Sequence, residues 1–448
     1  MTTIPALLRA AYEAAMRGAA GAAGIAPAGE SKALRSLRAR HRIRERYAAW
    51  AASARRTDRP LLWMHAPSVG EGLQARPVLV ALRSARPDVQ LAYTWFSPSA
   101  EAFASGLDVD FRDYLPFDTA SDARAALAAL RPRALVFSKL DVWPTLAREA
   151  SRRGVRLGLV SATLATTSGR RRPLAAALLR PAYAALDAVG AIAGEDADRL
   201  IELGVRRSAI VVTGDTRYDQ VWSRARAADL RSPLLSPLAP DAGTAASPRA
   251  RLTVVAGSTW PADEMPLLAA WTEMVSSAEH GARPLNRPRL IIAPHEPTPA
   301  HLQPIERWAA GAGLSLARLG STAAPSADVV LVDRLGVLGD LYALADIAFV
   351  GGAFHAAGLH SVLEPAAFGA PVLFGPRFGA SRDAALLIEA GGGASVERTL
   401  QLRERLEAWL GNDAARHAAG ARAREVVRGG LGAAGRSLAL VEGLLDAR

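Results

Sequence analysis

The sequence predicts an α/β protein with two domains, each built on a parallel β-sheet wrapped by helices. Strand-like apolar runs alternate with Ala-, Leu- and Arg-rich helical stretches almost throughout, a pattern typical of strands joined by crossover helices. Residues 226–250 break this rhythm with Pro, Ser and Gly, and we interpret them as a linker or surface loop. At 448 residues, the chain is long enough for two domains with separate cores.

The predicted strands form two series along the chain. The first series comprises residues 61–65, 91–94, 134–137, 157–160, 190–193 and 210–213. The second comprises residues 252–256, 290–293, 329–332, 347–350 and 372–374. We therefore expect the following organisation: a helical segment at 1–56, Rossmann-like domains at 57–225 and 251–430, the linker between them, and a C-terminal helix at 431–448.

Composition limits the possible classes of function. The absence of cysteine excludes disulfides, thiolate metal sites and cysteine nucleophiles. The sequence shows neither an uninterrupted apolar run of about 18 residues nor a recognisable secretory signal, so we expect a cytoplasmic location. No G-x-x-x-x-G-K-[ST] loop is present, which argues against an ATPase. No His, Asp or Glu cluster has the spacing of metal ligands, and we expect no metal site.

The basic charge is concentrated near the N-terminus. The net charge is +11, and residues 31–56 carry nine Lys or Arg against the single acid Glu45. Upstream, a helical spacing predicts one apolar stripe made by Ile4, Leu7, Leu8, Ala11, Tyr12, Ala15 and Met16. A stripe followed by a cationic helix is typical of a segment at a membrane surface, although a core-packing helix with a solvated basic neighbour fits equally well. Neither a motif nor interleaved aromatic residues accompany the charge, so we expect no nucleic-acid partner.

The first candidate motif is WMHAPSVGEG at residues 63–72. A strand leads through a turn containing Ser68 and Gly70 into a helix that begins near Glu71. Glu71 is therefore expected at the carboxyl end of a strand, where α/β sheets place their ligands, and could accept a proton from a hydroxyl group. The alternative is an ordinary carboxylate at a helix N-terminus.

The second motif is LVFSKLDVWP at residues 135–144. Lys139 is one of only two lysines in a chain with 54 basic residues, which favours a specific need for an ammonium group there. Lys139 and Asp141 stand two residues apart and would point the same way on an extended segment. We expect this pair to hold a sugar carboxylate or hydroxyls, or else to form a strand-end salt bridge.

Three further turns follow strands in the second half. AGSTW at residues 256–260 offers the hydroxyls of Ser258 and Thr259 to a phosphate or sugar. IIAPHEP at 291–297 carries an imidazole, His295, at another strand end, although a lone histidine is more often structural. The glycine turn at 335–337 could present backbone amides to a base or phosphate.

The most informative segment is FVGGAFHAAGLHSVLEPAAFGAPVLFGP at residues 349–376. A strand, a Gly351-Gly352 turn, a helix start and a second strand are the elements with which α/β domains bind anions. Glu364, in the first turn of the helix, can accept hydrogen bonds from ribose hydroxyls. The arrangement suits a nucleotide sugar, and the alternative is a structural turn whose glycines only allow tight packing.

Taken together, the motifs resemble the bacterial transferases of Kdo (3-deoxy-D-manno-octulosonic acid), from about residue 32 to about residue 430. Two Rossmann-like domains facing across a cleft form the GT-B architecture, which this resemblance also implies. The matching segments are HAxSVGE at 65–71, YLPFDT at 114–119, GDTRYD at 214–219, GSTWP at 257–261 and HxxLEPA at 360–366.

The resemblance implies an inverting transfer of Kdo from CMP-Kdo to a lipid A precursor (lipid IVA), at the cytoplasmic face of the inner membrane. It implies that Glu71 is the base and that no metal or cofactor is needed for the chemical step, and we expect a monomer. Lys139 or His295 and the helix N-termini would offset the negative charge of the sugar carboxylate and the leaving CMP. The implied CMP site comprises Pro294, His295, Leu335, Gly336, Val337, His360, Ser361, Val362, Leu363 and Glu364.

Three positions depart from the family pattern. Asp141 stands where the family usually has Glu, His295 where it commonly has Arg, and Ser361 where it has Asn. These departures leave two other hypotheses open. One is a GT-B enzyme or epimerase that uses another nucleotide sugar, and the other is a catalytically silent scaffold docked to the membrane.

Overall fold

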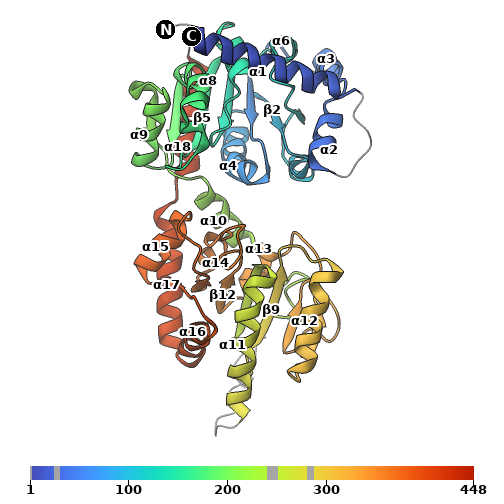
Figure 1. Cartoon of the computed structure of the whole chain (residues 1–448), viewed down its shortest axis with the longest axis vertical. Coiled ribbons are helices and arrows are strands. Elements are labelled where there is room, and N and C mark those ends of the chain that lie inside the picture. The colour runs from blue at the N-terminus through green and yellow to red at the C-terminus, as the bar shows by residue number, and fades with distance from the viewer. Residues whose placement is uncertain (1–2, 25–30, 240–250, 280–286, 448) are drawn as a thin grey trace. The chain divides into compact units, whose positions relative to one another are not determined.

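The computed structural model describes residues 3–24, 31–239, 251–279 and 287–447. The chain forms two compact units: unit 1 comprises Met1–Gln220 and Gly430–Arg448, and unit 2 comprises Val221–Gly429 (Figure 1). Helix α10 (Arg217–Ala227) leads from unit 1 into unit 2. Among the described helices, none combines the length and the apolarity needed to cross a bilayer.

Unit 1 is built on a seven-stranded sheet in which all paired strands are parallel. Its order is β3-β2-β1-β4-β5-β6-β7, so the chain moves outward from β1 and then crosses to the other side of it at β4. The strands are β1 (Leu61–His65), β2 (Gln90–Trp95), β3 (Phe111–Tyr114), β4 (Ala134–Ser138), β5 (Arg156–Ala162), β6 (Ala188–Ala191) and β7 (Ile210–Val212). The central strands β1 and β4 are buried along their whole length, as expected for a sheet covered on both faces.

The helices of unit 1 cover this sheet. One group packs in a row: α3 (Ile43–Ala54), α6 (Ala120–Leu130), α7 (Pro144–Ser151) and α8 (Pro173–Ala184). Helix α4 (Val69–Ala85) packs against α18 (Ala433–Asp446), and the short α5 (Glu101–Ser105) and α9 (Gly194–Leu203) complete the unit.

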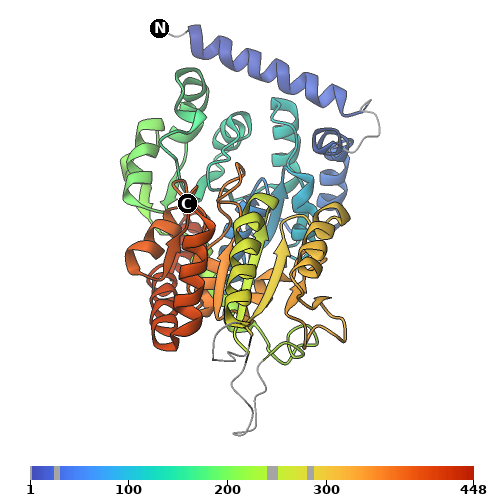
Figure 2. The same ribbon diagram turned by 60° about the horizontal axis from the view of Figure 1, so that its bottom comes forward.

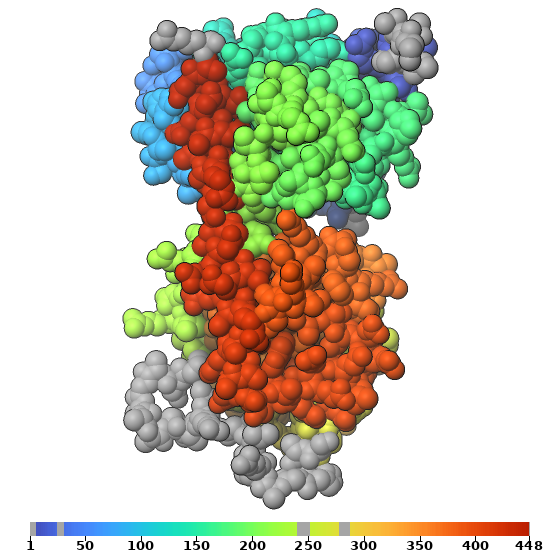
Figure 3. Space-filling model, turned by 90° about the vertical axis from the view of Figure 1, so that its left-hand side faces the viewer, coloured from blue at the N-terminus to red at the C-terminus, as the bar shows by residue number. Residues whose placement is uncertain are grey.

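Helix α18 belongs to the core of unit 1, although it comes from the far end of the chain. In Figure 3, α18 is coloured red and its outer side lies along the surface of this unit. Val441, Leu444 and Leu445 are buried in the core of unit 1. A Cβ at Gly158 of β5 would lie 2.6 Å from Leu444 Cδ1, so glycine is what allows α18 to approach the strand this closely.

Two helices precede α3, namely α1 (Thr3–Ala22) and α2 (Lys32–Ala39). Figures 1 and 2 both show α1 as a separate long helix running across one end of unit 1. The Tyr12 hydroxyl donates a hydrogen bond of 3.0 Å to Asp118 Oδ2 and so attaches α1 to the domain. The predicted apolar stripe is only half covered: Tyr12 and Met16 are partly buried, whereas Leu7 is 69% exposed.

Unit 2 contains a second parallel sheet of seven strands, with the order β10-β11-β9-β8-β12-β13-β14. The strands are β8 (Thr253–Thr259), β9 (Arg289–Pro294), β10 (Leu316–Arg318), β11 (Val329–Leu331), β12 (Ile347–Val350), β13 (Val372–Phe374) and β14 (Gly393–Ser395). Alternate residues of a strand enter different cores, because side chains of a strand point to opposite faces. Val254 and Ala256 pack with Trp271, and Val255 packs with Tyr342.

Helices cover both faces of the second sheet. Three of them contribute most of the helical residues in the core around Trp271, namely α11 (Pro261–Glu279), α12 (Pro299–Gly311) and α16 (Thr399–Gly411), and Ala419 of a later helix joins them. The others are α13 (Leu338–Leu341), α14 (Leu363–Phe368), α15 (Arg382–Ala390) and α17 (Asp413–Gly429). Of the expected linker, Leu235 and Leu238 are buried in the second core of unit 2, and residues 240–250 lie outside the described residues.

The predicted fold class, α/β with two Rossmann-like domains, is confirmed. Each of the eleven predicted strands overlaps an observed strand, although the segment predicted at 190–193 forms a strand two residues earlier. Strands β3, β10 and β14 were not predicted from the sequence. Their sequences, FRDY, LAR and GAS, contain polar or small residues and carry no apolar run that would mark them.

Each sheet has a switch point beside its first strand, where the chain, after adding strands on one side of that strand, returns and adds the next strands on the other side. In unit 1 this point lies between β1 and β4, and in unit 2 it lies between β8 and β12. Open α/β sheets bind ligands beyond the carboxyl ends of the strands at such points. The candidate motifs at residues 66–71 and 139–143 follow β1 and β4, and those at 258–260 and 351–364 lie at the ends of β8 and β12.

Candidate active site

Glu71 lies in the first turn of α4, directly beyond β1. Ser68 Oγ donates a hydrogen bond to Glu71 Oε2, and Lys139 Nζ lies 3.3 Å from Glu71 Oε1. The Glu71 side chain is 18% exposed and that of Lys139 is 42% exposed, so solvent or a ligand can reach the pair. A Cβ at Gly70 would meet only Ser68 Oγ, at 3.8 Å, and there is therefore open space beside this turn.

Lys139 follows β4 and has a left-handed backbone, with φ of 66°. Its N–H donates to the Val160 carbonyl of β5 at 2.9 Å, which holds this turn against the neighbouring strand. The expected pairing of Lys139 with Asp141 is wrong. Residues two apart point the same way only on an extended backbone, and the left-handed turn sends Lys139 toward Glu71 instead.

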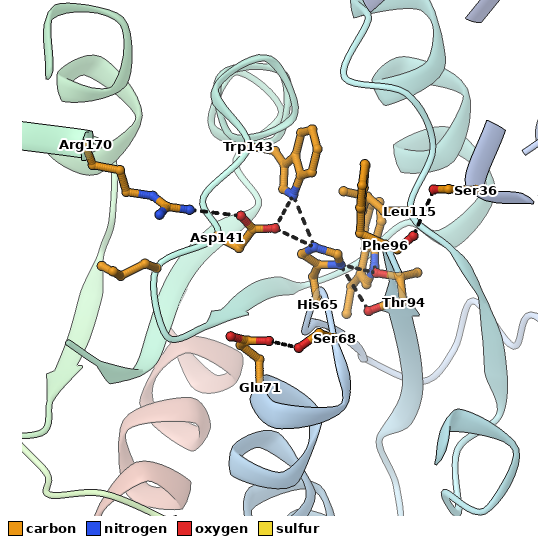
Figure 4. A network of polar contacts seen from close by, with 12 residues as sticks. Ser36, His65, Ser68, Glu71, Thr94, Phe96, Leu115, Asp141, Trp143 and Arg170 are labelled. Carbon is orange, nitrogen blue, oxygen red and sulfur yellow. Dashed lines mark hydrogen bonds and ion pairs between the residues drawn. The ribbon is translucent and has the colours of Figure 1, made fainter. Parts of the chain in front are cut away.

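Asp141 belongs to a separate network around the buried His65 (Figure 4). The Trp143 indole N–H donates to Asp141 Oδ2 at 3.0 Å and to His65 Nε2 at 3.2 Å. Arg170 donates to Asp141 Oδ1 at 3.2 Å, and His65 Nδ1 lies 3.0 Å from the Thr94 carbonyl. Burial would raise the pKa of Asp141, but its contact with His65, the charge of Arg170 and the hydrogen bond from Trp143 outweigh this effect and lower the pKa below its usual value.

In unit 2, the ends of β8 and β12 approach each other closely. A Cβ at Gly351 would overlap the Ser258 carbonyl, and a Cβ at Gly352, where φ is 95°, would overlap the Gly358 carbonyl. Ser258 itself has a left-handed φ of 53°. Thr259 is fully buried and donates its hydroxyl to Glu264 Oε1 at 2.7 Å, so this side chain is committed to the interior.

Asp263, in the first turn of α11, connects the two turns of unit 2. Its fully buried carboxylate accepts backbone N–H bonds from Trp260 at 3.0 Å, Gly352 at 2.7 Å and Phe354 at 2.9 Å. This role of Asp263 was not predicted from the sequence. The available signal was an acid shortly after the turn that ends a strand, but nothing local identifies a partner 89 residues away.

Four aromatic rings gather at this edge of the second sheet. Trp260 stacks on His355 at 4.4 Å and on His295 at 4.7 Å, and His295 stacks on His360 at 4.6 Å, as measured between ring centroids. The Trp260 indole N–H donates to His360 Nε2 at 3.3 Å, a contact that requires a lone pair on this nitrogen. Burial, and next the charge of His295, lower the pKa of His360.

The remaining residues of the expected CMP site differ in accessibility. Val362 and Leu363 are buried in packing, so only their backbone is available to a ligand, whereas Ser361 and Leu335 are exposed. Gly336 has φ of 89° in the turn between β11 and α13, Val337 precedes α13, and Pro294 ends β9. Burial raises the pKa of Glu364, nearby Arg224 opposes this effect, and Asp340 adds to it.

Comparison with known proteins identifies relatives of the chain. Residues 41–220 match the family model described as 3-deoxy-D-manno-octulosonic-acid transferase (kdotransferase). The 3-deoxy-D-manno-octulosonic acid transferase of Bordetella pertussis is 31% identical over 340 residues, which cover 74% of this chain and 75% of that protein. The Haemophilus influenzae enzyme of the same name is 25% identical over 419 residues, 92% of this chain and 93% of that one.

One solved structure of another protein is similar in fold, and at its low sequence identity this similarity supports the fold alone. The UDP-GlcNAc 2-epimerase of Neisseria meningitidis, bound to UDP-GlcNAc, aligns with a TM-score of 0.60 at 15% identity and covers 87% of this chain and 100% of that one. This likeness is consistent with the GT-B class predicted from the sequence. With its motifs and its relatives in agreement, the chain belongs to the Kdo transferase family of glycosyltransferases.

Proposed function

We propose that the protein transfers Kdo with inversion from CMP-Kdo to a hydroxyl of a lipid A precursor such as lipid IVA, a step of lipopolysaccharide core biosynthesis. The observation that carries this proposal is the Glu71–Lys139 pair at the switch point of the first sheet. It combines a partly exposed carboxylate in the first turn of a helix with an ammonium group from the next central strand. This is the chemistry that a hydroxyl nucleophile and an acidic sugar require.

In the proposed reaction, Glu71 accepts the proton of the acceptor hydroxyl while that oxygen attacks the anomeric carbon. The bond from this carbon to the phosphate oxygen breaks on the opposite face, and CMP leaves with the electron pair, which inverts the configuration. Lys139 Nζ, partly exposed, is available to the carboxylate of the sugar. Asp141 then acts indirectly, since it holds His65 and Trp143 behind the reacting groups.

The donor half of the proposal rests on unit 2. The Gly351-Gly352 turn and His295 supply backbone and imidazole groups near a phosphate, Ser258 and Ser361 supply hydroxyls, and Glu364 accepts from ribose hydroxyls. This assignment is supported by the position of these turns at the second switch point. Competition between CMP and UDP in a thermal-shift series tests the donor, and stabilisation by UDP alone would contradict the assignment.

We also propose that the protein works as a monomer bound peripherally at the cytoplasmic face of the inner membrane. The exposed Leu7 of α1 and the exposed cations of α2 support contact with an anionic lipid surface. Sedimentation of the protein with vesicles that contain anionic lipid tests this proposal. If the protein bound zwitterionic vesicles as well as anionic vesicles, the proposed attraction between the exposed cations of α2 and anionic lipid would be contradicted.

The decisive experiment is transfer of labelled Kdo to lipid IVA by the Glu71→Gln variant. We expect the rate to fall about a hundredfold or more, because the substitution removes a positioned base, while CMP binding is retained. Glu195→Gln is the matched control, since Glu195 also lies in the first turn of a helix in unit 1 but follows β6, away from the switch point. A fully active Glu71→Gln enzyme would remove Glu71 from the role of base, and a wild-type protein without transfer would contradict the function itself.

A further inference from the structure

Unit 1 contains an apolar cavity of about 400 Å³ that the catalytic proposal does not use. It lies beneath the N-terminal helices, and its walls come from α1, α2 and the loops that follow β2, β3 and β4. The apolar lining is provided chiefly by Met16, Ala19, Leu37, Phe96, Phe117 and Trp143. Such a lining favours a hydrocarbon ligand, because apolar surface removed from water contributes most of its binding energy.

Internal hydrogen bonds hold the walls of the cavity. On one side, Asp118 accepts from the Tyr12 hydroxyl at 3.0 Å and from the backbone N–H groups of Thr145 and Leu146 at 2.9 and 2.7 Å. These bonds tie α1 and α7 to the loop after β3. The cavity is therefore bounded by connected elements of one unit.

On the other side, the guanidinium of Arg40 lies 4.2 Å from the centroid of the Phe96 ring. It donates to the carbonyls of Leu115 at 2.8 Å, Ser36 at 2.6 Å and Phe96 at 3.1 Å. Burial lowers the pKa of Arg40 to about 10. Because the guanidinium of Arg40 is already bound to these wall residues, it is not available to a ligand. Any positive charge that a ligand meets must come from the rim of the cavity.

Lys32 of α2 is exposed and lines the cavity, whereas Arg35 and Arg38 are exposed on the same helix without lining it. Within the part of the chain that the structure describes, none of the three forms an ion pair. Three arginines further along the chain differ, since Arg42 pairs with Glu45, Arg44 with Asp122 and Arg46 with Asp113. Lys32 therefore brings an ammonium group without an ion-pair partner among the described residues to the rim of the cavity, and this charge complements a phosphate group.

The cavity shares two of its wall residues, Phe96 and Trp143, with the surroundings of Glu71. Trp143 lines the cavity and also donates its indole N–H to Asp141 and His65. Phe96 stacks on Trp143 with 5.3 Å between ring centroids, and its backbone N–H donates to the Pro67 carbonyl at 3.0 Å, in the turn that leads to Glu71. A ligand in the cavity would thus share a wall with the residues that flank the proposed base (Figure 4).

We propose that this cavity binds an acyl chain of the acceptor, whose phosphate lies against Lys32 at its rim. The inference rests on the proposed function, because it takes the acceptor to be a phosphorylated, acylated glycolipid. It assigns unit 1 a lipid-binding site separate from the Glu71–Lys139 pair. Each methylene group buried there contributes about fourfold in affinity, which corresponds to about 0.8 kcal/mol.

The test is to fill the cavity and compare two acceptors. Ala33 of α2 lines the cavity, and Ala33→Trp places a large side chain at its wall. We expect KM for the acylated acceptor to rise at least tenfold, with kcat/KM for the deacylated acceptor unchanged. Ala52→Trp, at an exposed position of α3, is the matched control and leaves both acceptors unaffected.

The outcomes separate this inference from the proposed function. A wild-type protein that transfers Kdo to neither acceptor contradicts the function, and binding then decides the cavity: calorimetry with dodecyl phosphate should show at least tenfold weaker binding to Ala33→Trp than to wild type or Ala52→Trp. Ala19→Phe, introduced from α1, should give the same result if Ala33→Trp does not fold. The inference would be overturned if the cavity-filling variants bound dodecyl phosphate as tightly as wild type. It would also be overturned if Ala33→Trp reduced kcat/KM equally for the acylated and the deacylated acceptor.

Discussion

The two units have the same kind of sheet but equip their switch points differently. Beyond β1 and β4 of unit 1, two charged side chains meet, Glu71 and Lys139, and both remain accessible. Beyond β8 and β12 of unit 2, glycines bring the backbone of two turns together and a row of aromatic rings lies beside them. Unit 1 thus presents side-chain charge at its switch point, whereas unit 2 presents a surface of backbone and rings, and in the proposed function the first serves the reaction and the second binds the donor.

Two carboxylates make the difference concrete, because each lies in the first turn of a helix after a central strand. Asp263 is fully buried and accepts three backbone N–H bonds, whereas Glu71 is 18% exposed and has two side-chain partners. A buried carboxylate whose acceptors are all engaged stabilises a loop. One that remains accessible beside a cation is available to a substrate.

The largest expected effect on stability is at Asp263. Asp263→Ala leaves three backbone N–H groups without their acceptor and should lower the free energy of unfolding by about 4 kcal/mol. Chemical denaturation followed by circular dichroism measures this loss. Glu407→Ala, which removes an exposed acid of unit 2, should cost less than about 1 kcal/mol, and equal losses in the two variants would break the distinction drawn here.

A smaller effect is expected at Lys139, and on activity rather than stability. Lys139→Gln should reduce kcat/KM for Kdo transfer about tenfold, because it removes the charge that we place beside the sugar carboxylate. Its free energy of unfolding should change by less than about 1 kcal/mol, since the ion pair is partly exposed. Lys139→Arg keeps the charge and should recover part of the loss, and a Lys139→Gln enzyme with full activity would limit the role of unit 1 to Glu71.

The smallest effect concerns pH and unit 2. The pKa of His360 is lowered by burial and by the charge of His295, while Asp263 opposes the shift. A histidine whose pKa is lower in the folded state stabilises the fold fully above its unfolded pKa of about 6.5, and this stability is lost as the pH falls through the folded value.

We therefore expect the melting temperature to decrease on acidification below about pH 6.5, and to decrease less in His360→Asn. Asparagine keeps an acceptor for the Trp260 indole but does not titrate in this range, so the difference between the two proteins isolates His360. If the melting temperatures of wild type and His360→Asn fell by the same amount on acidification, protonation of His360 would not be what destabilises the fold.

Much of the fold could be predicted because its central strands are buried on both faces. Strands β1 and β4 are therefore continuous apolar runs, which a sequence displays directly. Edge strands lack this signature, and β14, with the sequence GAS, has no side chain that would identify it. The motifs at Glu71, Lys139, Ser258 and His360 were also predictable, since each follows an apolar strand and breaks it with polar or small residues.

The partners of these residues could not be predicted in the same way. The sequence by itself determined which residues carry charge, where the strands end and which family the chain resembles. Only the tertiary structure decided that Lys139 turns toward Glu71 and away from Asp141, that Asp263 binds the turn after β12, and that α1 and α2 enclose an apolar cavity. The physical reason is that strand order and a left-handed backbone at Lys139 bring together groups that are distant along the chain, and no local pattern records either of them.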